Sequence, residues 1–440
     1  MLLQSSNYLH LSRKNYNSHW PNCTSTGFLF CRTISDMSFA SQQTRQTIFM
    51  KHPLFSFSSR IGLCMLLLTT ACSKSIDTHP DKNSATGIVT NITQSTVNVT
   101  TIAGKYGTQG DADGNGSNAR FWNPTKMVYD SRNKTLYVAD GTVIRSVDAK
   151  NNVKTYLPFG KINNYDEILD MDVTHDSVGG SLYFITEENS LYKIEPKGTS
   201  YKLTTVADRV YGGNKLGVLD TKDHFDLPYG LATGKNGDIF FFNQSWYTIH
   251  RIKLTSTAPF AGSVVKFAGK AAATRGGNTW PFADGAGDEA TFNSAVWDMC
   301  ADGKGNLYVA DYRDDLVRKV TTSGVVKSLF QYKNGLGVDV DGPVSQAQAN
   351  KVDHVSANND GTSIFFTTYG KYGSNSPALR VVRPNIDVTT LVGKIPHIWG
   401  DGPGDVAGFG EIGGIAATPD GKTVYVSEVA NKVIRKVTIQ

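Results

Sequence analysis

The fold of this chain is decided by a stretch that returns along it. Residues 110–124 read GDADGNGSNARFWNP, and this stretch is echoed by FADGAGDEATFNSA at 282–295 and by WGDGPGDVAGFGEI at 399–412. A more divergent copy, VDVDGPVSQAQANKV, covers 338–352. Each copy keeps an Asp-Gly pair, and three copies keep an alanine two residues before a phenylalanine: Ala119/Phe121, Ala290/Phe292 and Ala407/Phe409. A stretch that recurs in this way indicates a protein built from structural repeats.

The first copy also looks like the opening half of a calcium-binding loop. Asp111, Asp113 and Asn115 stand at alternate positions, and Gly116 follows them. Such a loop needs a bidentate Glu at its twelfth position, and here that residue is Trp122. We therefore interpret the stretch as a turn between strands, in which Gly supplies positive φ angles and Asp and Asn side chains cap backbone N–H groups.

Three further phrases also recur along the chain. They are KTLYVAD, GNLYVAD and KTVYVSE at 134–140, 305–311 and 422–428, then IRSV, VRKV and IRKV at 144–147, 317–320 and 434–437. A β-rich phrase ending in Gly-Lys closes the series, as VTTIAGK, VVKFAGK and VTTLVGK at 99–105, 264–270 and 388–394. A period of about 40 to 60 residues with four short alternating runs is typical of propeller blades.

These phrases resemble NHL repeats over roughly residues 97–440, and the resemblance implies an all-β propeller of four-stranded antiparallel blades. We place six blades, at 124–157, 166–207, 225–268, 292–330, 350–392 and 409–440. The last blade ends after its third strand, whereas residues 97–105 form a spare strand before the first blade. We predict that this N-terminal strand pairs beside 432–439 and closes the ring without a free edge.

The residues before the propeller divide into three segments. Residues 50–72 resemble a bacterial lipoprotein signal peptide, with a basic start, an apolar run and Cys72 after small residues, which implies lipidation of Cys72. Residues 73–95 are predicted to be a polar tether and residues 96–440 the propeller. Residues 1–49 do not fit a signal peptide, and we interpret them as a mis-assigned gene start or a disordered segment.

Charge and cysteine content limit the classes of partner. Residues 1–72 hold six basic residues and one acidic residue, so 38 of each remain from Ser73 onward, and this neutral balance gives no support to nucleic-acid binding. Cys300 is the single cysteine after Cys72, so the mature chain is expected to be stabilised by packing rather than by an internal disulfide.

Five tryptophans follow the leader, and all are predicted to lie on or near one face of the propeller. Four fall in or just after connections from an outer to an inner strand, and one falls between a second and a third strand: Trp122, Trp280, Trp297, Trp399 and Trp246. Flat aromatic rings beside Asp, Asn and Gly suit the stacking of sugars. The alternative is that two or three of these rings pack inward under the loops.

Polar residues follow the repeated aromatic position at the predicted channel mouth. They are Asn123, Asp226, Asn293, Asp353, His354 and Glu411. Lactonase-type and lyase-type propellers, which this arrangement resembles, hold a divalent cation in the channel, so these residues are candidate ligands for Ca²⁺ or another divalent cation. A binding ring without metal and a lining solvated by ordered water are the alternatives.

Each third strand also carries a basic residue, and because these recur we expect them to be structural. They are Arg145, Lys193, Arg251, Arg318, Arg380 and Arg435. The sequence therefore predicts a monomeric lipoprotein of the outer membrane of a Gram-negative bacterium, whose propeller binds a glycan or a partner protein. A cation-dependent hydrolase or lyase, similar to lactonases, and a scaffold without a small ligand are the alternatives; the sequence assigns no catalytic residue.

Overall fold

The computed structural model describes the propeller from Thr96 onward, with several gaps. The described residues are 96–162, 166–174, 180–197, 200–207, 228–254, 262–272, 282–293, 295–331, 338–369, 377–395 and 399–440. The predicted leader and tether, Cys72 among them, lie outside the described residues, as do Asp226 and Trp280.

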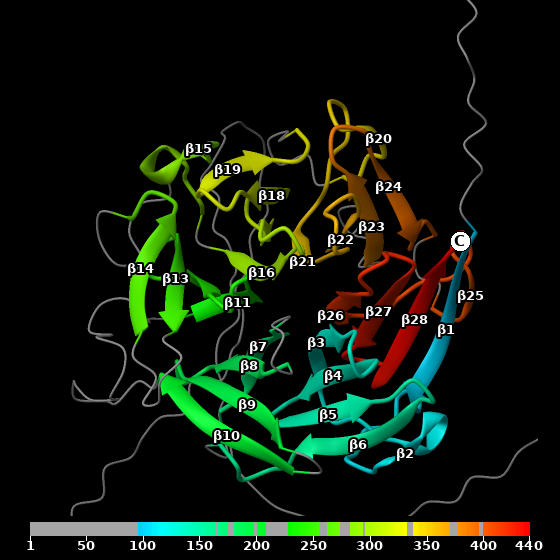
Figure 1. Ribbon diagram of the computed structural model, residues 1–440. Coiled ribbons are helices and arrows are strands. Elements are labelled where there is room, and N and C mark those ends of the chain that lie inside the picture. Colours follow the sequence, from blue (N-terminus) through cyan, green and yellow to red (C-terminus); the bar gives the residue numbers. More distant parts are fainter. Residues whose placement is uncertain are drawn as a thin grey trace, which may run out of the picture. The chain divides into compact units, whose positions relative to one another are not determined.

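Six antiparallel sheets follow one another around a central axis, and the first strand of each sheet lies nearest that axis (Figure 1). The predicted six-bladed all-β propeller is thus confirmed. Blade one contains β3 (Pro124–Asp130), β4 (Thr135–Asp140), β5 (Val143–Val147) and β6 (Asn152–Leu157). Blade two contains β7 (Ile168–Val173), β8 (Leu182–Thr186), β9 (Leu191–Lys197) and β10 (Ser200–Ala207). Blade three contains β11 (Pro228–Thr233), β12 (Ile239–Asn243), β13 (Thr248–Leu254) and β14 (Gly262–Ala268).

The other three blades repeat this order. Blade four contains β16 (Val296–Ala301), β17 (Leu307–Asp311), β18 (Leu316–Val320) and β19 (Val325–Ser328). Blade five contains β21 (Val352–Ala357), β22 (Ile364–Thr368), β23 (Ala378–Arg383) and β24 (Asp387–Val392). Blade six contains β26 (Ile412–Ala417), β27 (Thr423–Glu428), β28 (Val433–Ile439) and, as its outer strand, β1 (Val97–Gly104).

The N-terminal strand closes the ring as predicted. β1 runs antiparallel to β28 from the Val97–Ile439 pair to the Gly104–Val433 pair. At the end of this ladder the backbone N–H of Gln440 donates to the carbonyl oxygen of Thr96 at 3.1 Å. Pairing the first described strand with the last removes the free edges that an open array of sheets would present.

The repeated Asp-Gly stretch carries the chain across the top of a blade and adds a fifth, two-residue strand to its outer edge. These strands are β2 (Gly114–Asn115), β15 (Gly285–Ala286), β20 (Gly342–Pro343) and β25 (Gly402–Pro403), and single 3₁₀ turns follow the first two, as η1 (Gly116–Asn118) and η2 (Gly287–Glu289). The turn interpretation is therefore correct for the described copies.

The aspartate of each Asp-Gly pair binds an arginine on the third strand of the same blade. In blade one, Arg145 Nη2 lies 2.8 Å from Asp113 Oδ1 and Arg145 Nη1 donates to the carbonyl oxygen of Arg120 at 2.8 Å. The guanidinium also lies over the ring of Phe121, 5.4 Å from its centroid. The same contacts recur in blades four and six, from Arg318 and Arg435. The repeated phenylalanine is therefore a packing residue, held by a buried, charge-assisted arginine.

Two of the six predicted basic positions need correction. The structurally equivalent position in each blade is opposite the centre of the second strand, where Arg145 faces Val138. In blade two this place is taken by Tyr192, opposite Phe184, and in blade three by His250, opposite Phe241. Lys193 and Arg251 are displaced from it by one residue, and a shift of one residue turns a strand side chain to the other face of its sheet.

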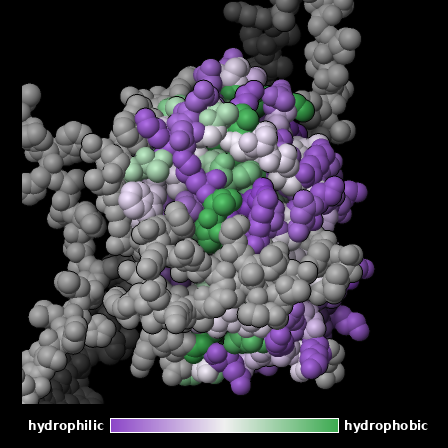
Figure 2. Space-filling model, turned by 60° about the vertical axis from the view of Figure 1, so that its left-hand side comes forward, coloured by the Kyte–Doolittle hydropathy of each residue, from purple (hydrophilic) through white to green (hydrophobic). Residues whose placement is uncertain are grey.

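Apolar side chains fill the spaces between neighbouring blades. Phe242 of blade three, for example, packs edge-on against Phe292 before blade four, with ring centroids 5.8 Å apart, in a cluster that includes Met299 and Val309. On the outer side drawn in Figure 2, hydrophilic side chains surround small hydrophobic patches. The core of this fold therefore lies between the blades, which leaves the central channel to be lined by other residues.

Candidate functional site

The two faces of the propeller differ in which connections they carry. All inner strands begin at one face, which we call the upper face, together with the outer-to-inner connections and the links between second and third strands. The inner strands end at the opposite, lower face, together with the links between first and second strands. Ligand sites of propellers lie along or at the ends of the central channel, so we examine the channel from the upper face downward.

One position of the inner strands recurs in all six blades and lies in the channel. Every inner strand has a register shift near its start, where it pairs with the second strand. The residue just before the one paired with the centre of the second strand is equivalent in each blade. In blade order these residues are Lys126, Asp170, Gly230, Asp298, His354 and Gly414. Two carboxylates, an ammonium and an imidazole thus meet within the channel.

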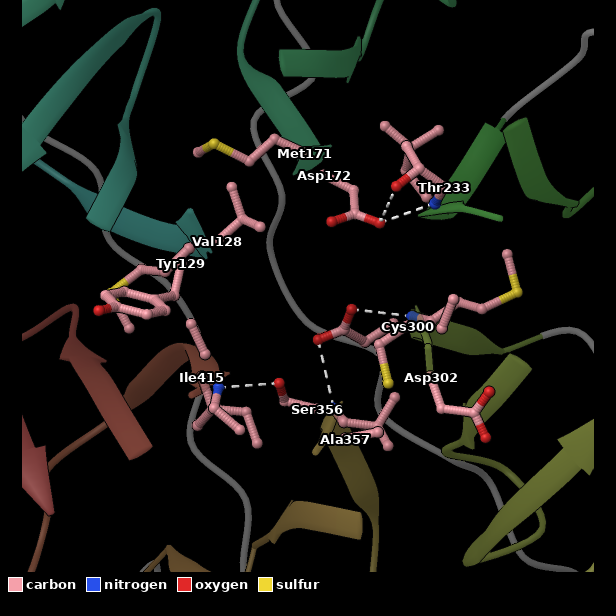
Figure 3. A pocket seen from close by; sticks show the side chains of 18 of the residues that line it. Val128, Tyr129, Met171, Asp172, Thr233, Cys300, Asp302, Ser356, Ala357 and Ile415 are labelled. Atoms are coloured by element: carbon pink, nitrogen blue, oxygen red, sulfur yellow. Dashed lines mark hydrogen bonds between the residues drawn. The ribbon is translucent and has the colours of Figure 1, made fainter. Parts of the chain in front are cut away.

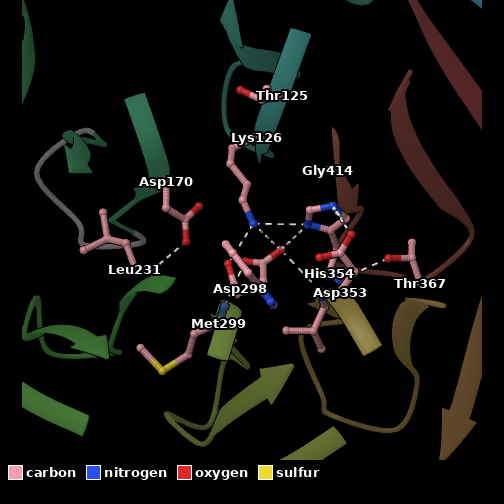
Figure 4. A network of polar contacts seen from close by, with 12 residues as sticks. Thr125, Lys126, Asp170, Leu231, Asp298, Met299, Asp353, His354, Thr367 and Gly414 are labelled. Carbon is pink, nitrogen blue, oxygen red and sulfur yellow. Dashed lines mark hydrogen bonds and ion pairs between the residues drawn. The ribbon is translucent and has the colours of Figure 1, made fainter. Parts of the chain in front are cut away.

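The side chain of Lys126 crosses the channel from blade one to blades four and five (Figure 4). Its Nζ lies 3.1 Å from Asp298 Oδ2, 3.1 Å from His354 Nδ1 and 3.1 Å from the carbonyl oxygen of Trp297. His354 Nδ1 also lies 3.3 Å from Asp298 Oδ2, and its Nε2 lies 3.3 Å from the carbonyl oxygen of Ile412. The buried network therefore joins blades one, four, five and six across the channel.

The charges of this network are set by burial and by mutual attraction. Burial alone would lower the pKa of Lys126, but Asp298, Asp170 and Asp353 outweigh it and raise that pKa, so the ammonium stays charged. Burial alone would raise the pKa of Asp298, but Lys126 and His354 lower it, so the carboxylate stays ionised. Burial and the nearby Asp298 raise the pKa of Asp170 well above its usual range. One ammonium and one carboxylate thus balance each other.

Glycines in blade six let its inner strand approach that of blade one. A Cβ atom on Gly413 would lie 2.7 Å from the carbonyl oxygen of Pro124, and one on Gly414 would lie 2.9 Å from that of Thr125. Neither neighbour is a flexible side chain that can move aside. The two glycines therefore narrow the channel on the side from which Lys126 extends.

A cavity of about 320 Å³ lies below this network, on the lower side (Figure 3). Its acidic side chains are already bound to the backbone of neighbouring inner strands: Asp170 Oδ2 accepts from Leu231 N at 2.6 Å, and Asp172 Oδ2 accepts from Thr233 N at 2.7 Å. The channel-facing edge of an inner strand has unpaired N–H groups, which these carboxylates satisfy. The larger cavity is therefore lined by groups that hold the blades together.

A smaller cavity of about 210 Å³ opens at the upper face, and we call it the mouth cavity. It is lined by Asp353, Thr367, Thr368, Tyr369, Pro377, Glu411 and Ile412. The Glu411 side chain is exposed, and among the described residues nothing donates a hydrogen bond to its carboxylate. Burial raises the pKa of Tyr369 to about 12, with further contributions from Asp353 and Glu411, so both carboxylates act on one phenol.

Four aromatic rings lead from the mouth cavity across blades five, four and three. Tyr369 meets Tyr312 with ring centroids 6.4 Å apart, Tyr312 meets Trp297 at 5.9 Å, and Trp297 meets Tyr229 at 5.5 Å, all nearly edge to face. We call this set (Tyr229, Trp297, Tyr312, Tyr369) the aromatic arc. The indole N–H of Trp297 is buried without a hydrogen-bond partner among the described residues. The arc combines apolar rings with polar tips.

The structure separates the predicted tryptophans. Trp297 belongs to the aromatic arc, and Trp246 is half-buried in the link between β12 and β13. Trp122 and Trp399 are 58% and 56% exposed and make no ring contact with another aromatic residue in the described part of the chain. Trp280 lies outside it. Of the four tryptophans that the structure describes after the leader, Trp297 joins the aromatic arc.

The structure places the residues of the predicted polar ring at the channel mouth in several different locations. Asp353 and Glu411 share the mouth cavity, whereas His354 lies one layer deeper with Lys126. Asn293 is buried and donates to Asp314 Oδ1 at 2.7 Å, and Asn123 is tied by its backbone N–H to Asp140 at 2.5 Å. Among the described residues, no group of three or more His, Cys, Asp or Glu side chains is arranged to hold a metal ion. The described members of the predicted ring thus do not meet at one point, and we derive no cation-dependent step.

The carboxylate beside Asn293 gives blade four an unusual acidic pair. Asp311 and Asp314 are both buried, and burial together with Asp314 raises the pKa of Asp311 to about 8. Blade six carries Asn431 where blade four carries Asp314, and the amide of Asn431 donates to Glu428. The Arg318 side chain compensates one of the two carboxylates, 3.5 Å from Asp311 Oδ2. This pair is thus a feature of the blade rather than of the channel.

Sequence reasoning missed Lys126, Asp170 and Asp298. Each is a charged residue inside a short apolar run, as in NPTKMVYD, EILDMDV and AVWDMC. The signal was the shared register, because all three precede by one residue the position paired with the centre of the second strand. A charge at a buried strand position is expensive unless paired, and three at one register indicate a common partner.

No family model matches this chain, and no curated protein matches it by sequence. Solved structures do. A Bacteroides thetaiotaomicron protein of unknown function matches with a TM-score of 0.58 and 18% identity, over 79% of this chain and 77% of that one. An auxiliary nutrient binding protein of the same species matches with a TM-score of 0.55 and 16% identity, over 79% of this chain and 77% of that one. An auxiliary nutrient binding protein from Bacteroides ovatus matches with a TM-score of 0.55 and 17% identity, over 79% of this chain and 78% of that one. At these identities the likeness is one of fold, a six-bladed β-propeller.

Proposed function

We propose that this protein is a binding module of the cell envelope that holds a saccharide, alone or at the end of a glycan, in the mouth cavity. The observation that carries the proposal is the aromatic arc, which leads to a cavity bearing Asp353 and Glu411. Aromatic rings stack on the apolar faces of sugars, and carboxylates accept hydrogen bonds from their hydroxyl groups. The fold shared with two Bacteroides nutrient binding proteins is consistent with this role.

The size of the cavity supports a small ligand. Its volume of about 210 Å³ is below the roughly 300 to 1,000 Å³ of pockets that bury drug-sized molecules. The aromatic arc extends beyond it through Tyr312 and Trp297, which provides surface for further sugar units. A monosaccharide at Tyr369, with a chain continuing over the arc, is the arrangement that we propose.

We expect aromatic substitutions within the arc to weaken glycan binding. Residues 73–440 are titrated with an oligosaccharide panel by calorimetry, and the glycan that binds is then tested against Tyr369→Ala and Trp297→Ala. Each variant should lose about tenfold in affinity, because an aromatic contact contributes about 0.5–1.5 kcal/mol beyond its burial. Trp122→Ala, which removes an exposed ring outside the arc, is the matched control and should bind normally.

Two outcomes would contradict the proposal. Normal affinity in both Tyr369→Ala and Trp297→Ala would show that the arc is not the site. A loss in Trp122→Ala equal to the loss in Trp297→Ala would return the site to the broader tryptophan face. A panel without any binding glycan would favour a partner protein instead.

The envelope location is a part of this proposal that rests on Cys72. Within the described residues, no helix is long and apolar enough to cross a membrane. β1 begins at the lower face, beside Ile439, so the chain before Thr96 joins the propeller opposite the mouth cavity. Cys72 and Thr96 are 24 residues apart, which allows an extended reach of about 80 Å. A lipid on Cys72 would therefore leave the mouth cavity free to face away from the membrane.

Replacing Cys72, the residue that we propose to be lipidated, tests the anchor. Cys72→Ser is expected to move the protein from the membrane fraction to the released fraction of fractionated cells, because a thiol is required for the acyl chains that supply membrane affinity. Cys300→Ser, which removes the other cysteine after the leader, is the control and should remain with the membrane. A Cys72→Ser protein that stays in the membrane fraction would refute lipid anchoring.

A further inference from the structure

We propose that the ligand of the mouth cavity carries a positively charged amino group, as an amino sugar does, and that Asp353 and Glu411 bind this group. The inference rests on the proposed function, since it names the class of saccharide held at the same site. It follows from the charge of the cavity wall, from a contact that the chain makes with its own lysine, and from the closed network below.

The wall of the mouth cavity carries negative charge without a compensating cation. Among its lining residues, Asp353 and Glu411 are the titratable carboxylates, and none is Lys, Arg or His. Asp353 Oδ2 lies 3.4 Å from His354 Nε2, which also lies 3.3 Å from the carbonyl oxygen of Ile412. Glu411 has no ion pair with a described residue. Two carboxylates at one cavity are stabilised when a bound cation lies between them.

The network below compensates these carboxylates only in part. Lys126 attracts Asp353, but its ammonium lies 3.1 Å from each of Asp298, His354 and the carbonyl oxygen of Trp297. Its charge is balanced chiefly by Asp298, whose pKa is lowered against burial by Lys126 and His354. Glu411 has no ion pair with a described residue, so its charge remains for a ligand that enters from the upper face.

The aromatic arc already holds an ammonium from the chain itself. Lys351 Nζ lies 5.0 Å from the ring centroid of Tyr312, and it is 3.9 Å from Asp315 Oδ1. Tyr369, the next ring of the arc, lies beside Asp353 and Glu411 and has no such contact with a cation among the described residues. A ligand ammonium in the mouth cavity would lie beside the ring of Tyr369 and the carboxylates of Asp353 and Glu411, much as Lys351 lies beside Tyr312 and Asp315. A ring face and a carboxylate together bind ammonium more strongly than either group alone.

Three sugars that differ at one substituent test this inference. Residues 73–440 are titrated near pH 6 with D-glucosamine, N-acetyl-D-glucosamine and D-glucose, and binding is followed by ligand-observed NMR. We expect glucosamine to bind about tenfold tighter than the two neutral sugars, because hydrogen bonds to charged groups are roughly twice as strong as neutral ones. Asp353→Asn/Glu411→Gln should lower the affinity for glucosamine much more than the affinities for the two neutral sugars, so that the three sugars bind about equally.

Asp405→Asn is the matched control for the loss of negative charge. Asp405 is exposed on the outer-to-inner connection of blade six and does not line the mouth cavity. Equal binding of the three sugars, or a glucosamine affinity that Asp353→Asn/Glu411→Gln and Asp405→Asn lower equally, would overturn the amine preference and leave the saccharide site standing. Absence of binding by all three sugars would overturn the preference and the monosaccharide site together.

Discussion

A chain that begins at Tyr106 is expected to lose the cooperative fold. Such a chain lacks β1, so β28 is left as an exposed edge and blade six is reduced to three strands. The loss includes the buried side chains of Val99 and Ala103. It also includes two hydrogen bonds in which the backbone N–H and the hydroxyl of Thr101 donate to the carboxylate of Asp401, at 2.9 and 3.0 Å. Burial of a valine side chain contributes about 1.5–3 kcal/mol, and each hydrogen bond contributes about 1 kcal/mol net. Summed over the ladder between β1 and β28, these contributions are comparable to the free energy of unfolding of a typical domain.

Thermal unfolding of two truncated chains measures this effect. Residues 96–440 should unfold at the same temperature as residues 73–440, whereas residues 106–440 should show no cooperative transition or should aggregate through the open edge. A synthetic peptide of residues 96–105, added to the shorter chain, should restore part of the transition, because it supplies the missing ladder. A shorter chain that melts like the longer one would show that ring closure does not stabilise the propeller.

Lys126→Met is expected to destabilise the protein by about 3–5 kcal/mol, the usual cost of removing one partner from a buried charge pair. Methionine fills a similar volume but leaves Asp298 buried without its ammonium. Lys126→Met/Asp298→Asn should recover much of the loss, because the amide oxygen still accepts from the backbone N–H of Met299 and no charge remains. Urea unfolding of both variants and the wild type gives the three free energies.

The pH dependence of Lys126→Met identifies the buried charge as the cause. In the wild type the pKa of Asp298 is lowered, so its contribution to stability is present above about pH 4, the unfolded value, and is lost as the pH falls through the lower folded value. Without Lys126, burial is opposed by His354 and by the backbone N–H groups of Met299 and Val355 but by no ammonium, and the pKa of Asp298 should rise. The destabilisation should therefore be larger near pH 8 than near pH 5. An equal loss at both values, unrelieved by Asp298→Asn, would indicate a packing defect.

The repeats predicted the architecture because each blade is a local unit. The phrase LYVAD, for example, forms β17, and all five of its residues are buried, with Leu307 and Val309 in one hydrophobic cluster and Tyr308 and Ala310 in another. A short apolar run of this length predicts a strand with both faces buried. The ring closure was also predictable, since the spare strand at 97–105 matches the phrases that end other blades. Divergent copies were harder to align, and Lys193 and Arg251 were placed one residue away from the equivalent positions.

The site was predicted only in part because its residues come from different blades. Trp297 of blade four and Tyr369 of blade five are 72 positions apart in the sequence, and one ring, that of Tyr312, joins them. The sequence shows that a tryptophan follows a connection, but an exposed ring such as Trp122 and an arc member such as Trp297 have the same local signature. Asp353 and Glu411 were both among the predicted polar residues, and the structure adds that these two share a cavity.

The amino-acid sequence by itself determined the number of blades, the order of strands and the pairing of the first strand with the last. These depend on hydrophobic alternation and turn residues, which act over a few neighbouring positions. The tertiary structure alone decided that Lys126 meets Asp298 and His354 across the channel, and that the aromatic arc ends at two carboxylates. Such contacts depend on the angle between blades far apart in the chain, and that angle follows from how all six sheets pack around one axis.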